Sequence, residues 1–500
     1  MQTTFPESRI TACNDKPVRE DGAFVLYWMI ANRRTNDNFS LQRALGYARH
    51  LRKPLLVLEA LRCDYQWVSD RLHSFIIDGM LDNAAAFANT RVRYYPYIES
   101  ERGAGKGLLR ALAERACVVI SDDFPCFMLP NMLAAAAKQV PVRTEKIDSN
   151  GLMPMYLTDK IYPTAYNFRQ YLQRELPKHL SQFPQPDPLA ELDLPLLESL
   201  PDDILQKWPA ADLSAWQRSR NKMLASLPID HYVGIVGQRG GHQAAQQQLE
   251  VFLQQRLARY SDERNQPQQE VTSGLSPYLH FGHISVHRVF TELAAQEQWG
   301  IEQLAATTRG NREGWWGMRA PAEAFLDELI TWREVGYNMC ARNPDYDKYE
   351  SLPDWAITTL EQHASDYRPD LYSLEEFEHA RTHDSLWNAA QNQLRQEGRI
   401  HNYLRMLWGK KILQWSASPR EALAVMIELN NKYALDGRNP NSYSGIFWVL
   451  GRYDRPWGPE RPIFGKIRYM TSENTARKVA VKEYIERYAP SGQSTLFSNR

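Results

Sequence analysis

Short apolar runs alternate with amphipathic stretches in the first third of the chain. Five of the runs are rich in β-branched and aromatic residues and have the length of buried strands: residues 24–30, 54–61, 92–98, 116–123 and 140–147. The segments between them, such as FSLQRALGYARHL at residues 39–51, carry apolar residues at helical spacing. Strands spaced by helices form a parallel sheet covered on both faces. We therefore predict a Rossmann-like α/β domain over residues 21–180.

The pattern changes after about Val233 to long segments with helical periodicity, at residues 243–260, 320–339 and 400–415. A mostly α-helical domain is predicted over residues 233–490. The stretch between Gln182 and Pro209 is rich in proline and acidic residues. Residues 181–232 are therefore predicted to form an interdomain linker packed over the surface. Residues 1–20 and 491–500 are expected to be loose tails.

The composition is that of an ordinary globular protein. The 500 residues include 59 basic and 59 acidic side chains, and 43% are hydrophobic, which excludes the disordered and collagen-like classes. No apolar run approaches 18 residues, so no membrane helix is expected. The polar N-terminal segment does not have the pattern of a secretory signal. These features predict a cytoplasmic protein, and nothing in the sequence implies a protein partner or more than a monomer.

Charge is unevenly distributed along the chain. Residues 401–500 contain 16 Lys and Arg against 8 Asp and Glu, a local excess of 8 positive charges. Such an excess favours a polyanionic partner near that end, although an ordinary solvated basic surface explains it equally well. The five cysteines include no C-x-x-C pair, so neither a zinc site nor an iron–sulfur cluster is expected.

The segment TSGLSPYLHFGHIS places two hydroxyl residues and a glycine just before Pro277, which suits the first turn of a helix. Hydroxyls and free amides at a helix start can bind a diphosphate. Tyr260, twelve residues upstream, is positioned to close over the same group. A simple helix cap is an equally good interpretation of this segment alone. GAGKG at residues 103–107 lacks the first glycine and the Ser or Thr of a phosphate loop, so that function is not expected.

Two patterns that include tryptophan are compatible with functional roles, one in electron transfer and one in hydrogen bonding by an acid. Trp408 and Trp415 are seven residues apart in one predicted helix, which stacks them on one face about 10 Å apart. That separation permits electron hopping, although aromatic residues at helical spacing more often form a core. Glu328 and Trp332 are four residues apart, which sets a carboxylate beside an indole. If both are buried, the pKa of Glu328 rises and the protonated acid can donate a hydrogen bond; an exposed glutamate is the alternative.

Several strings of the second domain resemble a known family when taken together. They occur in family order: LSPYLHFGHIS, ELITWRE, HDSLWNAAQ, RMLWGKKILQW, LNNKYALDGRNPN and RPIFGKIRYM. The sequence is similar to the class II cyclobutane pyrimidine dimer photolyases of the photolyase and cryptochrome superfamily. The segment YWMIANRRTNDN at residues 27–38 also resembles the start of the family's N-terminal domain. The resemblance implies light-driven repair of pyrimidine dimers in DNA, with FAD in the helical domain, active in its reduced anionic form.

The resemblance also implies roles for individual residues. The flavin contacts would be Tyr260, Thr272, Ser273, Gly274, Leu275, Ser276, Arg405, Asn430 and Asp436. Asn430 would face flavin N5, and its amide can donate or accept a hydrogen bond. The relay that re-reduces the flavin would comprise Trp408, Trp387 and Trp415. The lesion and DNA contacts would be Glu328, Met406, Trp332, Trp448 and Arg455. The family implies no metal. An antenna chromophore, a deazaflavin or a folate, would be optional in the α/β domain.

Two features depart from the family pattern. Asn439 stands where Asp is expected, and the interval between Trp448 and Arg455 is one residue short. Both departures concern the DNA contacts and not the flavin contacts. A cryptochrome-like blue-light receptor without repair activity is the nearest alternative function. A colourless nucleotide-dependent transferase or binding module is a second alternative. Repair of the 6-4 photoproduct would require a histidine pair in the lesion pocket, whereas His280 and His283 lie in the predicted flavin segment.

Overall fold

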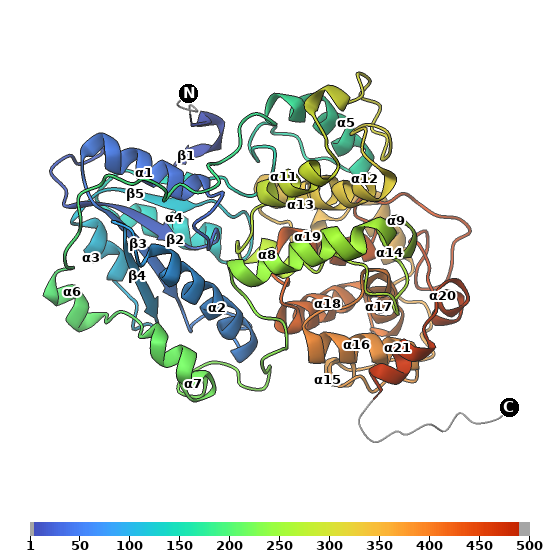
Figure 1. Cartoon of the computed structure of the whole chain (residues 1–500). Helices are drawn as coiled ribbons and strands as arrows, with labels where there is room; N and C mark the ends of the chain where they lie inside the picture. Colours follow the sequence, from blue (N-terminus) through green and yellow to red (C-terminus); the bar gives the residue numbers. More distant parts are fainter. Residues whose placement is uncertain (1–4, 490–500) are drawn as a thin grey trace.

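Six strands form one sheet in the first part of the chain. The computed structural model describes residues 5–489 (Figure 1). The strands are β1 (Ile10–Ala12), β2 (Phe24–Met29), β3 (Leu55–Leu61), β4 (Arg93–Ile98), β5 (Ala116–Asp122) and β6 (Thr144–Ile147). Their order across the sheet is β1-β6-β5-β2-β3-β4, and every pair except β1–β6 is parallel. The five predicted strands and the α/β class are confirmed.

The N-terminal segment is not a loose tail throughout, so this part of the prediction is wrong. β1 pairs antiparallel with β6, with Ile10 opposite Ile147. Arg9 is 1% exposed and donates hydrogen bonds to the carbonyl oxygens of Gly151 and Leu152. Buried partners on a distant segment therefore order this polar stretch. The predicted tail at residues 491–500 lies outside the described residues.

Alternate side chains of β2 enter two different cores, as the pleat of a strand requires. Val25 and Tyr27 pack with α1 (Phe39–Leu51) on one face. Leu26 and Trp28 belong to a larger core that continues into the helical part of the chain. The other helices of this region are α2 (Asp70–Phe87), α3 (Leu108–Ala113) and α4 (Leu129–Gln139). The sheet thus shares a core with the helices that follow.

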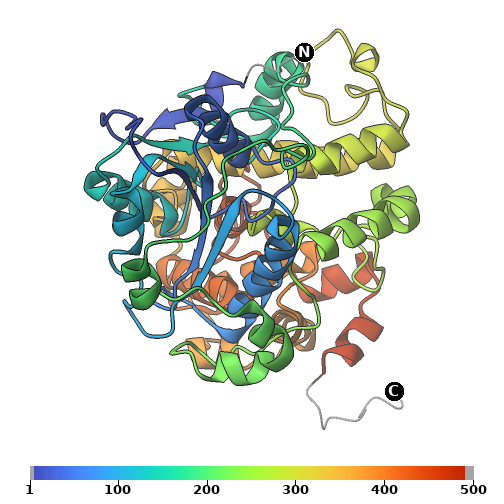
Figure 2. The same cartoon turned by 60° about the vertical axis from the view of Figure 1, so that its left-hand side comes forward.

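The predicted linker contains two helices, α6 (Asp202–Lys207) and α7 (Leu213–Ala225), which run along the outside of the sheet region before the chain returns to the helical part (Figures 1 and 2). α5 (Ala165–Glu175) was assigned to the α/β domain but packs on the helical part, where Arg169 forms an ion pair with Asp327 at 2.7 Å. The boundary at residue 180 stays a prediction.

The helical part begins at α8 (His242–Val251) and provides the walls of the site. Its principal helices are α9 (Tyr260–Glu263), α10 (Ser276–His280), α11 (Val286–Gln296), α12 (Ala320–Leu326), α13 (Arg333–Arg342), α14 (Asp354–Gln362), α15 (Leu374–Glu378), α16 (Ser385–Glu397), α17 (Asn402–Trp415), α18 (Pro419–Tyr433), α19 (Pro440–Val449), α20 (Ser472–Lys478) and α21 (Lys482–Arg487). A π-helical turn, η6 (Asp327–Trp332), connects α12 to α13. Such turns occur frequently at functional sites. No helix within residues 5–489 is long and apolar enough to cross a membrane.

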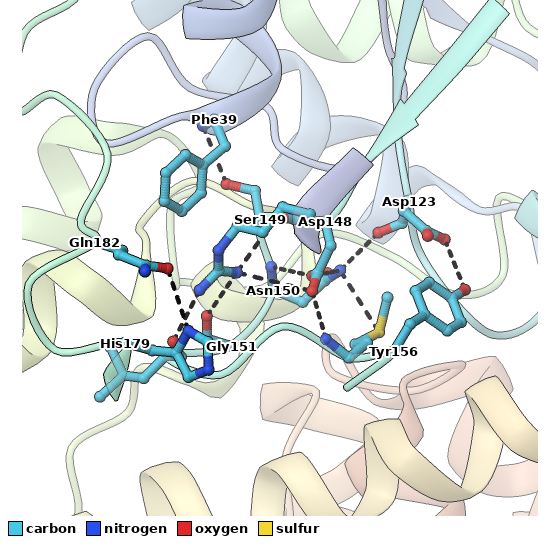
Figure 3. Close-up of polar contacts among 12 residues, drawn as sticks. Phe39, Asp123, Asp148, Ser149, Asn150, Gly151, Tyr156, His179 and Gln182 are labelled. Atoms are coloured by element: carbon cyan, nitrogen blue, oxygen red, sulfur yellow. Dashed lines mark hydrogen bonds and ion pairs between the residues drawn. The ribbon is translucent and has the colours of Figure 1, made fainter. Parts of the chain in front are cut away.

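The turn after β6 joins the sheet to the helical part (Figure 3). Asn150 donates to Asp148 and to the carbonyl oxygen of Asp123, at 2.9 and 2.6 Å. Its own carbonyl accepts from Arg333 on α13 at 2.7 Å. Glu334, which follows Arg333 on α13, accepts from the Leu152 amide at 2.8 Å. These bonds fix α13, and the π-helical turn before it, relative to the sheet.

Candidate active site

A cavity of about 870 Å³ opens among the helices of the second part. This cavity is lined by most of the residues that were expected to bind the flavin: Tyr260, Thr272, Ser273, Gly274, Ser276, Arg405 and Asp436. Leu275 is buried and lies outside the lining. Gly274 adopts φ +67°, a region that disfavours other residues, so the hydroxyl-rich turn can bend sharply there. The fold therefore brings together residues from four separate segments.

The charges and hydroxyls of this cavity fit a dinucleotide with an acidic diphosphate. Arg239, Arg256 and Arg405 supply cations on the wall, beside the hydroxyls at the start of α10. Arg405 lies 3.4 Å from Asp436, whose other oxygen accepts from Ser276 at 2.7 Å. The Nε of Arg405 and both ring nitrogens of His401 are buried without partners among the described residues. A ligand with hydrogen-bonding groups would satisfy such atoms.

Burial affects the charges of two lining residues. Desolvation lowers the pKa of His401 to about 4, so its ring is neutral at pH 7. Desolvation also raises the pKa of Glu328, while the cation of Arg264 opposes that rise. Arg264 donates to Glu328 at 2.9 Å, and the glutamate side chain is 34% exposed. The direction of this pKa shift is the one expected for a buried Glu328, and Arg264 is a partner of the carboxyl that the sequence did not predict.

Asn430 is buried on α18, and its amide nitrogen is fully engaged. It donates to Ser442 at 2.7 Å and to Asn431 at 3.1 Å. The carbonyl oxygen is therefore the atom that the side chain can direct at a ligand. Asn439, the departure from the family pattern, accepts from the Asn441 amide at 2.9 Å and caps α19. Asn caps a helix as well as Asp does, so the substitution preserves this turn.

Three buried tryptophans form a connected row beside the cavity. Trp408 lies one turn after Arg405 on α17, and Trp387 on α16 donates to the carbonyl oxygen of Trp408 at 3.0 Å. The rings of Trp387 and Trp415 are in edge contact, with centroids 6.0 Å apart. Trp387 therefore bridges the two tryptophans of α17. The sequence did not predict Tyr372, whose ring centroid is 5.6 Å from that of Trp415. The Tyr372 hydroxyl lies 2.5 Å from Nδ1 of the half-exposed His383.

The two tryptophans assigned to the lesion pocket meet in space. The ring centroids of Trp332 and Trp448 are 5.3 Å apart, with planes inclined by 33°. Met406 is half-buried on α17, and Arg455 is exposed beyond α19. The Arg455 guanidinium lies over the ring of Trp457 at 5.1 Å, and Arg468 lies over the same ring at 5.2 Å. Trp457 and Arg468 were not anticipated, although both belong to the basic C-terminal hundred residues.

A second cavity, of about 620 Å³, lies at the switch point of the sheet, beyond the carboxyl ends of β2 and β5. Its walls are mainly apolar and aromatic, including Trp28, Phe124 and Phe127. Lys106, from the glycine-rich loop, adds positive charge, whereas Arg33 is ion-paired with Glu59 at 2.9 Å. Ile30, Ala31 and Arg33 come from the segment at residues 27–38 that resembles the start of the family's N-terminal domain.

The two histidines weighed for a different repair reaction have other partners than Trp332 and Trp448: His283 is fully buried and His280 is half-buried. His283 accepts from the Gly241 amide at 2.9 Å and stacks on Phe75. His280 lies 3.1 Å from Asn439 and lines the second cavity. Burial holds the pKa of both rings well below the ordinary value. Among residues 5–489, no group of three His, Cys, Asp or Glu side chains could hold a metal ion.

Comparison with known proteins identifies the family. No family model matches the chain. The deoxyribodipyrimidine photo-lyase of Methanothermobacter thermautotrophicus is 32% identical over 480 residues, which cover 96% of this chain and 97% of the relative. The one from Potorous tridactylus is 32% identical, covering 98% and 86%. A bacterial class III photolyase from Agrobacterium tumefaciens shares the fold, with a TM-score of 0.67 over 93% of this chain and 86% of its own, at 17% identity. Membership of class II stays a prediction. The superfamily expected from the motifs is confirmed, and the chain belongs to the deoxyribodipyrimidine photo-lyases.

Proposed function

We propose that this chain is a class II photolyase that uses light to split cyclobutane pyrimidine dimers in DNA, with FAD as its cofactor. The observation that carries the proposal is one arrangement of side chains. A cavity with dinucleotide-binding groups is lined by Arg405 and Glu328. Arg405 lies one turn before Trp408 of the buried tryptophan row on α17, and Glu328 lies on η6, which also carries Trp332 of the contacting pair. Bound FAD, when reduced and excited by light, supplies the electron that opens the dimer.

The residues of the large cavity bind and orient the cofactor. Thr272 and Ser273 would donate hydroxyl hydrogen bonds to the diphosphate. The Ser276 hydroxyl donates to Asp436 and positions that carboxylate on the cavity wall. The cation of Arg405, on the cavity wall, would favour the anionic form of the ring system electrostatically. Asn430 is buried behind the residues that line the cavity, and its carbonyl oxygen would be available to the ring, because Ser442 and Asn431 accept from its amide nitrogen.

The lesion residues receive a dimer that has left the duplex. A dimer stacks poorly, so extruding it costs less than flipping intact bases; photolyases are themselves among the base-flipping enzymes from which this rule is drawn. The indoles of Trp332 and Trp448 replace part of the lost stacking. Glu328, whose raised pKa favours the protonated form, donates a hydrogen bond to a pyrimidine carbonyl, where negative charge develops.

The experiment that tests this function is illumination of the purified, chemically reduced protein with dimer-containing DNA. We expect dimers to be lost in the light and retained in a dark control. A protein that carries flavin and responds to light without removing dimers would instead act as the cryptochrome-like receptor. A colourless protein that cannot be reconstituted with FAD would overturn the proposal altogether.

We also propose that the second cavity holds an antenna chromophore. Its aromatic walls suit a flat heteroaromatic ring, and its position at the switch point is the usual ligand site of such sheets. Deazaflavin and folate are distinguished by adding each to the purified protein. The bound one should add its own absorption band, and excitation in that band should drive repair. Ala31→Trp, which would fill the cavity, should remove the band while repair under direct flavin excitation persists.

A further inference from the structure

The α5 helix and the loop after α11 together build a shelf beside Trp332. The loop runs over residues 305–319 and is attached to α5 at one point. Gln173 accepts from the Gly310 amide at 2.8 Å and donates to the Asn311 carbonyl oxygen at 2.9 Å. Arg169 adds a hydrogen bond to the Gly310 carbonyl oxygen. Arg169 and Gln173 are both at least 95% buried, so they hold this part of the loop in place.

The shelf borders a hollow of about 330 Å³ that also includes Trp332. Tyr166, Arg312, Trp332 and Tyr453 line it, together with Arg169, Gly310 and Asn311. Trp332 contacts Trp448 and also lines this hollow, so the hollow adjoins the proposed lesion site. Tyr166 is 52% exposed, and the Arg312 side chain is 65% exposed. An aromatic ring and a cation thus stand free at the edge of that site.

The charge at this edge is not balanced. Asp327 accepts from Arg169 in a bidentate pair, at 2.7 and 3.0 Å. The Nε atom of Arg312 is 4.0 Å from the same carboxylate. One acid therefore faces two guanidinium groups, and Arg312 retains most of its charge for an outside partner. An exposed guanidinium is well suited to a phosphate group.

We propose that this shelf binds the DNA strand next to the dimer, with Arg312 on a backbone phosphate and Tyr166 against a neighbouring sugar or base. The inference rests on the proposed function, because Trp332 must receive the dimer for the shelf to adjoin the strand. Within that function it assigns a DNA-binding role to α5 and to the loop at residues 305–319. The two elements come from different parts of the chain and meet only in the folded protein.

The test is the salt dependence of binding to a dimer-containing single-stranded oligonucleotide. A lost phosphate contact lowers the slope of log K against log salt concentration by about 0.7 for a single strand. Arg312→Ala should show that lower slope and weaker binding at low salt, whereas Arg312→Lys should retain the slope. Tyr166→Ala should weaken binding at every salt concentration with little change in slope.

Arg174→Ala is the matched control, because Arg174 is an exposed arginine of the same helix that does not line the hollow. It should bind as the original protein does. The inference would be overturned if Arg312→Ala had the affinity and slope of the original protein while the original protein repaired dimers. The proposed function would then stand. Failure of the original protein to bind or repair dimers would overturn the proposed function instead.

Discussion

The indole rings of Trp332 and Trp448 contact each other, with centroids 5.3 Å apart and planes 33° from parallel. A base stacked between two rings needs about 3.5 Å on each side, or about 7 Å in all. The observed pair leaves less than that. A dimer must therefore stack on an outer face of the pair or push the rings apart. In both cases the two side chains act as one binding surface and not as independent contacts.

Removing either indole should weaken binding of dimer-containing DNA. Each stacked base contributes about 1–3 kcal/mol, so Trp332→Ala and Trp448→Ala should each lose an amount in this range. Because the rings touch, the double variant should lose less than the sum of the two losses. Dissociation constants for the four proteins measure the coupling. Strict additivity would contradict a shared surface, and binding of undamaged DNA serves as the control.

Glu328 should govern the pH dependence of repair. If the protonated acid donates to the dimer, the yield per photon should fall as pH rises through its pKa, and Glu328→Gln should abolish this fall. The cation of Arg264 lowers that pKa, so Arg264→Gln should move the fall to higher pH. Arg259→Gln, which removes an exposed cation paired with Glu263, is the matched control and should leave the profile unchanged. An unaltered yield in Glu328→Ala would remove this residue from the mechanism.

The tryptophan row should serve photoreduction and not repair. Trp408→Phe or Trp387→Phe should stop light-driven reduction of the oxidised protein, because each interrupts the row next to the cavity. The chemically reduced variants should still repair dimers at close to the original yield. Trp316→Phe changes a buried indole of another cluster and should photoreduce normally. Transient absorption and dimer loss are the two measurements, and normal photoreduction in Trp408→Phe would refute the relay.

The periodicity of the sequence predicted the elements that depend on local pattern. The parallel strands were identifiable because each is an apolar run bounded by helical segments, as at Phe24–Met29. β1 was missed, since its three residues are held by pairing with β6, more than 130 positions away. The π-helical turn at Asp327–Trp332 was missed as well. In this turn the backbone departs from the regular α-helix that the four-residue spacing of Glu328 and Trp332 had implied.

The residues of the site were predicted mainly through the resemblance, and the structure adds the partners that motifs do not contain. Arg264 had no signal in the sequence, because its ion pair with Glu328 joins the residue after α9 to η6 across 64 positions. Tyr372 likewise meets Trp415 only through tertiary packing. A cavity is formed by several distant segments at once, so neither its volume nor its charge balance can be calculated from spacing.

Glu334 should make the stability of the protein depend on pH. Desolvation raises its pKa from 4.5 to about 7, despite the opposing cation of Arg333. The folded state then binds a proton that the unfolded state has released, so the free energy of unfolding falls as pH rises from 4.5 to 7. The fall amounts to about 3 kcal/mol, at 1.36 kcal/mol for each pH unit.

Glu334→Gln keeps the acceptor for the Leu152 amide and should lose less stability over this interval. Melting temperatures at pH 5 and pH 8 measure the difference, and Glu302→Gln, at an exposed position, should match the original protein at both. Parallel pH profiles for Glu334→Gln and the original protein would contradict a buried proton at the junction of the sheet and the helices.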